Sequence, residues 1–263
     1  MRFIIACVKF FLFWCAVVVQ LPILAILPSG RISIAYSRFF WIVLMWVSGV
    51  HYKKTGVKLS KNRPLMIVSN HISVLEFAVF PIVFGAGMIG KDGIKKMPLV
   101  GYVAKKVGVV FIKRERSAAA TETAKIADSI MNVKYPMLIF PEGTTTSGTY
   151  VLPLKSAMFS FAEGNDKLTI QPVVMHYRTA RGHKISDQVM ADDYAYFDNV
   201  KMTQPPYCKV ERSAFGQLFH IMKIGGVRLD LHVLPPADTA GLNRKQIAEL
   251  LHAQINEYFN KHK

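Results

Sequence analysis

The fold is decided by the stretch Leu65-Met66-Ile67-Val68-Ser69-Asn70-His71-Ile72-Ser73-Val74-Leu75-Glu76, where a strand pattern is followed by a helix pattern. Its first four residues are apolar and, with Ser69, are typical of a buried strand, and the apolar spacing from Val74 to Val83 is typical of a helix. On a regular helix His71 and Glu76 would point roughly 140° apart and would not meet. We therefore expect His71 in a turn that leaves the strand, with Glu76 early in the next helix. There the carboxylate can fold back and fix the tautomer of the imidazole.

The same alternation of short apolar runs and helical segments continues along the chain. Strands are expected at Leu65–Ser69, Val107–Ile112, Met137–Phe140, Leu168–Val174 and Val227–Leu234. Helices are expected at Val74–Val83, Ser117–Met131, Lys155–Glu163 and Asn243–Phe259. This pattern predicts an α/β domain with a mixed, largely parallel sheet flanked by helices. Residues 177–226 show no periodicity and are expected to form loops and short elements.

The N-terminal segment is apolar over two blocks. Residues 10–27 could form a helix roughly 27 Å long, enough to cross a bilayer or to lie deep in one leaflet. Residues 39–50 are too short to cross, but Trp41 and Trp46 suit a membrane interface. A retained anchor is favoured over a cleaved signal peptide, because the apolar part is long and residues 27–30 lack a small-residue cleavage site. The sequence predicts a two-helix membrane anchor over residues 1–52, followed by a domain over residues 53–263.

Composition narrows the possible partners. The chain has 263 residues, is 51% hydrophobic and carries 33 Lys and Arg against 17 Asp and Glu, a formal charge of +16. Apolar and basic character together favour an anionic membrane surface or anionic substrates. The basic residues are scattered and follow no nucleic-acid-binding pattern, so nucleic acid is not expected as a partner. Cys7, Cys15 and Cys208 form neither a disulfide framework nor a metal set, and no metal is expected.

Polar residues follow two further strands. Lys113 and Arg114 end one strand, and a guanidinium there suits a phosphate group. Glu142, Gly143 and Thr144 follow another strand, in a turn that offers amides, a carboxylate and hydroxyls to a polyol-like ligand. Such loops lie at the sheet edge where α/β proteins bind ligands. On its own, each loop is also compatible with an ordinary solvated turn.

A glycine-rich segment at residues 85–90 has the spacing of a dinucleotide-binding motif, and with Lys91 it approaches a phosphate-binding loop. Asp92 stands where that loop requires Ser or Thr, and Gly93 interrupts the helix that either motif needs. Neither function is therefore expected. Lys91 remains as a cation expected close to His71.

Four motifs together resemble the glycerolipid acyltransferases, specifically the 1-acylglycerol-3-phosphate acyltransferases. They are Asn70-His71 with an acid five residues later, Gly-x-x-Phe-Ile-x-Arg ending at Arg114, Phe-Pro-Glu-Gly-Thr over residues 140–144, and a Pro-Val strand around Pro172. The likeness covers residue 64 to about residue 175, and the N-terminal anchor agrees with it. The four motifs together are much more specific for this family than any one of them alone.

The resemblance implies roles for individual residues. His71 is expected to be the general base and Glu76 the acid that orients it. Arg114, with Lys113, is expected to bind the substrate phosphate. The third motif implies that Glu142 and Gly143 help to bind the glycerol backbone, and we add Asn70, Lys91 and Thr144 as substrate-binding candidates. The segment at residues 170–174 is associated with the acyl donor.

The implied reaction transfers a fatty acyl group to the sn-2 hydroxyl of lysophosphatidic acid and gives phosphatidic acid. The donor is acyl carrier protein or coenzyme A as a thioester, and no cofactor is implied. The segment at residues 151–159 also looks like the bacterial lyso-ornithine-lipid acyltransferases, so that acceptor, or another lysophospholipid, is an alternative. The implied location is the cell inner membrane, among its phospholipids, with the active site facing the cytoplasm.

One residue departs from the family pattern. The acid of the first motif is normally Asp, and here it is Glu76, whose extra methylene moves the carboxylate by roughly one bond length. A catalytically silent membrane protein that binds lipid is therefore the alternative from a different functional class. Activity is favoured over this alternative because the phosphate and glycerol motifs are kept together.

Overall fold

A seven-stranded sheet forms the centre of the protein. The computed structural model describes residues 1–95, 99–112, 119–194 and 213–263. The strand order across the sheet is β1-β7-β6-β2-β5-β3-β4. The strand bounds are β1 Val50–Gly56, β2 Leu65–Ser69, β3 Gly87–Lys91, β4 Val109–Ile112, β5 Met137–Ile139, β6 Thr169–Thr179 and β7 Val227–Val233.

All neighbouring strands run parallel except β6 and β7, which are antiparallel. The predicted mixed, largely parallel α/β sheet is thus confirmed. Ser69, the last residue of β2, pairs with Val173, and β6 continues beyond it to Thr179. Parallel β2, β5, β3 and β4 bring their carboxyl ends to one edge, so the loops that follow them share that edge.

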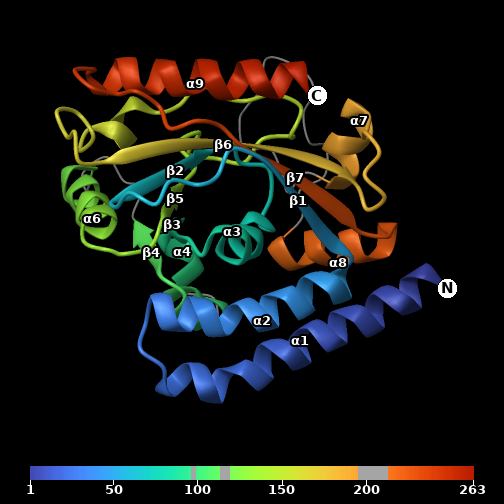
Figure 1. Cartoon of the computed structure of the whole chain (residues 1–263). Helices are drawn as coiled ribbons and strands as arrows, with labels where there is room; N and C mark the ends of the chain where they lie inside the picture. Colours follow the sequence, from blue (N-terminus) through green and yellow to red (C-terminus); the bar gives the residue numbers. More distant parts are fainter. Residues whose placement is uncertain (96–98, 113–118, 195–212) are drawn as a thin grey trace.

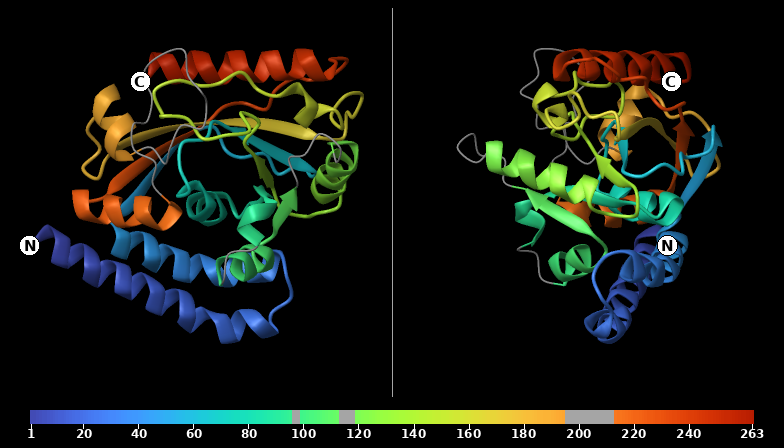
Figure 2. Two further views of the ribbon diagram at one scale, coloured as in Figure 1. Left: turned by 180° about the vertical axis from the view of Figure 1, so that it is seen from behind. Right: turned by 60° about the vertical axis from the view of Figure 1, so that its left-hand side comes forward.

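Helices cover both faces of the sheet (Figure 1). Figure 2 shows α9 along one side of the sheet and the α1–α2 pair on the opposite side. The helix bounds are α1 Arg2–Ile26, α2 Arg31–Ser48, α3 Glu76–Phe84, α4 Asp92–Lys95, α5 Val100–Lys106, α6 Ala119–Met131, η2 Ser156–Phe159, α7 Asp187–Val189, η3 Met190–Tyr194, α8 Ala214–Ile224 and α9 Arg244–Lys261. Asn243 caps α9 with a capping box, as its position before the apolar pattern predicts.

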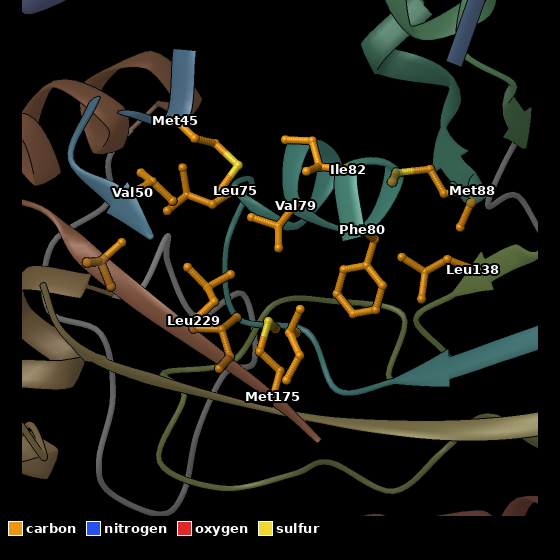
Figure 3. Packing of buried hydrophobic residues seen from close by; sticks show 14 of the residues in the cluster. Met45, Val50, Leu75, Val79, Phe80, Ile82, Met88, Leu138, Met175 and Leu229 are labelled. Carbon is orange, nitrogen blue, oxygen red and sulfur yellow. The ribbon is translucent and has the colours of Figure 1, made fainter. Parts of the chain in front are cut away.

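Two apolar cores lie on the two faces of the sheet. Strand side chains alternate between them: Ile67 of β2 points into one core, and Met66 and Val68 point into the other. The first core packs α3 and α8 between the sheet and the N-terminal helices, and Figure 3 shows Val79 and Phe80 of α3 within it. The second core packs α6 and α9. Because Val79 and Phe80 are buried in the first core, helix α3 is held in place, and this positions its first residue, Glu76.

The two N-terminal helices differ in character. Among the described residues, α1 is the one helix long and apolar enough to cross a bilayer, with a mean hydropathy of 2.3 over its most apolar window. Only 17% of that window is buried, which separates α1 from a core helix. Helix α2 packs between α1 and α3, so it is partly a component of the domain. The predicted two-helix anchor therefore holds for α1 and in part for α2.

Several predicted elements differ from the observed ones. The apolar run that ends at Val50 leads into β1, so the predicted boundary at residue 52 falls inside a strand that pairs with β7. The prediction of only loops and short elements for residues 177–226 was wrong for α8, an 11-residue helix. The predicted helix at residues 155–163 is reduced to the 3₁₀ helix η2, because Lys155 N donates to Pro141 O and the following turns close with i→i+3 bonds.

Candidate active site

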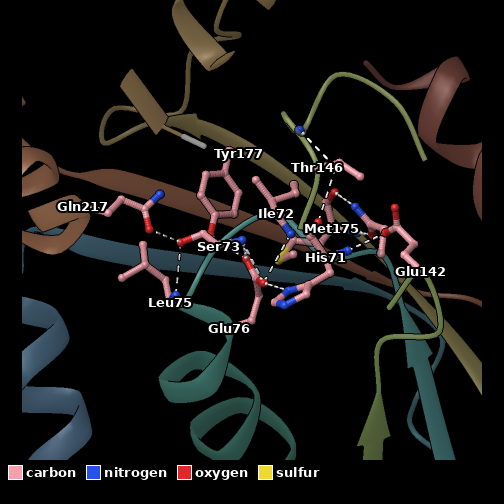
Figure 4. A network of polar contacts seen from close by, with 12 residues as sticks. His71, Ile72, Ser73, Leu75, Glu76, Glu142, Thr146, Met175, Tyr177 and Gln217 are labelled. Carbon is pink, nitrogen blue, oxygen red and sulfur yellow. Dashed lines mark hydrogen bonds and ion pairs between the residues drawn. The ribbon is translucent and has the colours of Figure 1, made fainter. Parts of the chain in front are cut away.

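The turn between β2 and α3 brings His71 and Glu76 together. Nδ1–H of His71 donates to Oε2 of Glu76 over 2.5 Å (Figure 4). Glu76 is the first residue of α3, as the spacing predicted, and the helix N-terminus favours a negative charge there. Because the carboxylate accepts from Nδ1, the tautomer with an unprotonated Nε2 is favoured. Within the described part of the chain, no group bonds to Nε2.

The carboxylate of Glu76 is fully buried and has several donors. Ser73 N donates to Oε1 at 2.8 Å and to Oε2 at 3.0 Å, and Ile72 N donates to Oε2 at 3.3 Å. The Tyr177 hydroxyl of β6 donates to Oε1 at 2.7 Å. Burial, and then the charge of Glu76, raise the pKa of Tyr177 well above its ordinary value of 10, so this hydroxyl stays a donor. The longer side chain of Glu76 is thus fully accommodated.

A further set of hydrogen bonds supports this turn. Ser73 Oγ donates to Gln217 Oε1 at 2.9 Å and accepts from Leu75 N at 3.1 Å. Gln217 is fully buried in α8, and its Nε2 donates to the carbonyl of Tyr194 at 2.7 Å. Figure 4 shows Gln217 and Tyr177 on the side of Glu76 away from Glu142. Buried networks of this kind, fully satisfied, hold a geometry rigidly.

Aromatic packing fixes the plane of the His71 ring. The ring stacks on Phe140 with centroids 4.2 Å apart and planes 12° apart. Phe140 in turn meets Phe80 edge to face at 5.8 Å. The His71 side chain is 12% exposed, so most of it is buried and a small part stays open to solvent. A fixed plane and a fixed tautomer together aim Nε2 in one direction.

The loop after β5 is attached to the backbone of His71. Glu142 is buried, and its Oε1 accepts from His71 N at 2.7 Å while Oε2 accepts from Leu152 N at 2.9 Å. Thr146 N donates to the His71 carbonyl at 2.9 Å. These bonds favour a positioning role for Glu142, where the sequence predicted substrate binding.

Gly143 and Thr144 directly follow Glu142 in this loop. Gly143 has φ +74°, and a Cβ there would collide with the Lys155 side chain. Thr144 Oγ1 is buried, and no partner for it occurs among the residues that the structure describes. The proximity of both residues to His71 follows from the Glu142 contact, and their predicted roles with substrate stay predictions.

The remaining predicted site residues are placed less directly. Asn70 is buried, and its carboxamide bonds to the backbone of Met175 at 2.8 and 3.0 Å, so it joins the end of β2 to β6 and favours positioning over substrate contact. The backbone of Lys91 ends β3 and pairs with Ile112 at the end of β4. Lys113 and Arg114 lie outside the described residues. The structure therefore unites His71, Glu76, Glu142, Gly143 and Thr144, and leaves the predicted phosphate-binding cations untested.

Sequence reasoning missed Tyr177, Gln217 and Phe140. Tyr177 and Gln217 are 101 and 144 residues from their partners, and no local spacing encodes such contacts. Phe140 was visible as the residue before the Pro-Glu-Gly turn, but its stacking on His71 depends on strand order. Among the described residues, no three His, Cys, Asp or Glu side chains gather as metal ligands.

Comparison with known proteins agrees with this geometry. Residues 51–176 match the family model described as Acyltransferase. A lyso-ornithine lipid O-acyltransferase of Rhodobacter capsulatus is 33% identical over 48% of this chain and 49% of its own length. The Saccharomyces cerevisiae 1-acyl-sn-glycerol-3-phosphate acyltransferase is 28% identical over 53% of this chain and 47% of its own length. The chain thus spans about half of the length of these curated relatives.

A solved structure extends the likeness in fold. The crystal structure of the 1-acyl-sn-glycerophosphate (LPA) acyltransferase PlsC from Thermotoga maritima matches with a TM-score of 0.62 and covers 100% of this chain and 98% of its own. At 15% identity this match shows the fold alone. The His71 turn, the Glu142 loop and β6 all lie within or at the edge of the matched family segment. The segment of this chain that contains the His71 turn and the Glu142 loop, residues 51–176, is therefore similar to the Acyltransferase family.

Proposed function

We propose that this protein transfers a fatty acyl group from an acyl thioester to the free sn-2 hydroxyl of 1-acylglycerol-3-phosphate. The single observation that carries the proposal is the 2.5 Å contact between His71 Nδ1 and Glu76, which leaves Nε2 as a proton acceptor. An imidazole in this state is the usual general base for activating a hydroxyl. Its position in the segment that matches the Acyltransferase family model supports the choice of reaction.

In the proposed mechanism, Nε2 of His71 accepts the proton of the acceptor hydroxyl while the oxygen attacks the thioester carbonyl. Glu76 stabilises the resulting imidazolium, as buried acids beside catalytic histidines do. The C–O bond forms, the C–S bond breaks, and the imidazolium returns its proton to the leaving thiolate. The sequence contains no nucleophile elbow, so the acyl group passes directly to the acceptor without an acyl-enzyme.

The polar loop at Glu142 holds the base during this cycle. Its carboxylate fixes the backbone N–H of His71, and Thr146 fixes the carbonyl of the same residue. Both contacts restrain the turn without using the imidazole. Gly143, Thr144 and the cations Lys91, Lys113 and Arg114 are the proposed contacts of the glycerol and phosphate groups, with the donor held as an acyl carrier protein or coenzyme A thioester.

A second acceptor is supported by the comparisons. Several relatives are named lyso-ornithine lipid O-acyltransferase, and the Rhodobacter capsulatus and Brucella abortus proteins are 33% and 31% identical to this chain over the matched regions. The proposed chemistry is the same for either acceptor, because only the hydroxyl reacts. The alternative of a silent lipid-binding protein is disfavoured by the complete set of partners around Glu76.

Membrane association follows from α1 and is part of the proposal. Large apolar side chains of α1 are exposed, including Ile4, Val8 and Phe11. Such a surface is typical of a segment that enters a bilayer. We place the protein at the cell inner membrane with the active site on the cytoplasmic side, where both proposed acyl donors would be soluble.

The test is a product analysis with the purified full chain in mixed micelles. Lysophosphatidic acid and lyso-ornithine lipid are each offered with acyl carrier protein and coenzyme A thioesters, and products are identified by mass. Formation of phosphatidic acid is expected. If only lyso-ornithine lipid is acylated, that lipid is the acceptor in place of lysophosphatidic acid. If neither lysolipid is acylated, the proposed function is wrong.

A further inference from the structure

A basic hollow of about 580 Å³ lies away from His71, between the start of α1, the turn after β6 and the end of α8. Arg2 and Lys9 of α1 line it, with Arg181 from the turn and Lys223 from the last turn of α8. His183 adds an imidazole. No Asp or Glu is among the residues that line the hollow. Segments distant in sequence thus converge with one sign of charge.

The four cations have no anionic partner in the described part of the chain. None of them takes part in an ion pair there. Lys223 suits the carboxyl end of α8, where a cation is favoured. Arg2, Lys9 and Arg181 do not lie at the carboxyl end of a helix, so this effect does not apply to them. Like charges that line one hollow repel one another, and an anion bound between them would relieve that repulsion.

The orientation of α1 sets the depth of the hollow in a membrane. Arg2 and Lys9 are seven residues apart and so lie on one face of the helix. Ile4, Val8 and Phe11 are 67%, 54% and 67% exposed and form a stripe on the opposite side. If this stripe enters the acyl region, the cations lie roughly one helix diameter, about 10 Å, farther out. That is the level of lipid phosphate groups.

The hollow is separate from the reacting centre. Val173 of β6 pairs with Ser69 beside His71, and Thr179 lines the hollow six residues farther along the strand. At about 3.3 Å per residue these two ends are roughly 20 Å apart. The residues that line the hollow include none of His71, Glu76 and Glu142, so the hollow is a place distinct from the one where the acceptor hydroxyl reacts.

We propose that this hollow binds the phosphate-bearing headgroup of an anionic bilayer phospholipid, a second lipid in addition to the acyl acceptor. The lipid chains lie beside the apolar stripe of α1, and the phosphate lies between Arg2, Lys9, Arg181 and Lys223. The site holds α1 against α8. Tyr194 lines the hollow, and its carbonyl accepts from Gln217, so the bound headgroup lies against the same hydrogen-bond network that supports Glu76.

The test compares two double variants of equal charge change in the full-length chain. Arg181→Glu with Lys223→Glu alters the hollow. Arg244→Glu with Lys245→Glu is the matched control, because both residues are exposed on α9, across the sheet from α1 and α2. Binding is measured by sedimentation with vesicles of phosphatidylcholine, with and without phosphatidylglycerol. Native mass spectrometry in detergent counts phosphatidylglycerol molecules retained by each protein, and melting curves verify folding.

The hollow variant is expected to lose at least about tenfold in binding to phosphatidylglycerol vesicles and to lose the retained lipid, while the control keeps both. Equal losses in the two variants would mean diffuse surface charge and would overturn the site. So would full retention of lipid by the hollow variant. If that variant keeps lipid but no longer retains acyl carrier protein added in the same native mass spectrometry experiment, the partner is the carrier protein and the lipid proposal is wrong. None of these readouts depends on turnover, so they leave the proposed acyl transfer to its own test.

Discussion

Removing the hydroxyl of Tyr177 tests how far catalysis depends on the partners of Glu76. In Tyr177→Phe the ring keeps its buried position, since the residue is 4% exposed. The change removes the hydroxyl, which donates to Glu76 Oε1 at 2.7 Å and is also hydrogen-bonded with the Ser73 side chain. The carboxylate keeps its bonds to Ser73 N and His71 Nδ1. The variant thus removes one of the four donors to the Glu76 carboxylate and keeps the other three.

The size of the effect follows from the charge and burial of the acceptor. A hydrogen bond to a charged group contributes about 1.5–3 kcal/mol. Glu76 is fully buried, so bulk water does not replace the lost donor. If this loss is felt when the imidazolium forms, kcat falls about tenfold to hundredfold, at 1.36 kcal/mol per factor of ten. KM is expected to change little, because the hydroxyl acts on the base through Glu76 and is not expected to contribute to substrate binding.

The assay is the initial rate of thiol release from the acyl thioester in mixed micelles, over a range of acceptor concentrations. Tyr52→Phe is the matched control, since Tyr52 is 43% exposed on β1. A Tyr177→Phe enzyme with wild-type kcat would refute the reasoning that this donor stabilises the dyad. A loss confined to KM would refute it too, and would indicate contact with substrate.

Three further changes test other parts of the structure. Glu76→Asp withdraws the carboxylate by roughly 1.5 Å from its donors and is expected to lower kcat about hundredfold, so a raised rate would contradict the fit of the longer side chain. Gly143→Ala places a side chain at φ +74° against Lys155 and should lower the free energy of unfolding by about 1–2 kcal/mol, measured by urea titration; unchanged stability would be evidence against this strain. Burial lowers the pKa of His176 from 6.5 to about 4, so between these pH values the unfolded chain binds a proton that the folded chain does not, and stability falls as pH falls, by about 3 kcal/mol in all. His176→Gln should remove this pH dependence, and the same slope in both proteins would exclude His176 as its source.

The local turn at His71 could be predicted because it depends on neighbours in sequence. A buried strand ending at Ser69 and an apolar helix starting near Val74 leave only a short connection, and five residues of separation then bring Glu76 back to the ring. The N-cap of α9 at Asn243 was predictable for the same reason. Both are signals that act within one or two turns of chain.

The support of the site could not be predicted, because it comes from other elements. Tyr177 reaches Glu76 only because β6 lies beside β2, and Gln217 reaches Ser73 only because α8 packs on the same face of the sheet. Helix α8 did carry a local signal, with Ser213 as its cap and Leu218, Ile221 and Met222 buried at helical spacing. It was missed within a segment that otherwise lacks periodicity.

The most direct test of the account is the single-turnover rate of acyl transfer by His71→Ala, with the purified chain preloaded with acceptor and mixed with acyl thioester. Loss of a general base is expected to lower this rate by about 10²–10⁴, while the protein keeps its folding transition and its affinity for the lysolipid. A His71→Ala protein that transfers the acyl group at close to the wild-type rate would contradict the assignment of His71 as the base.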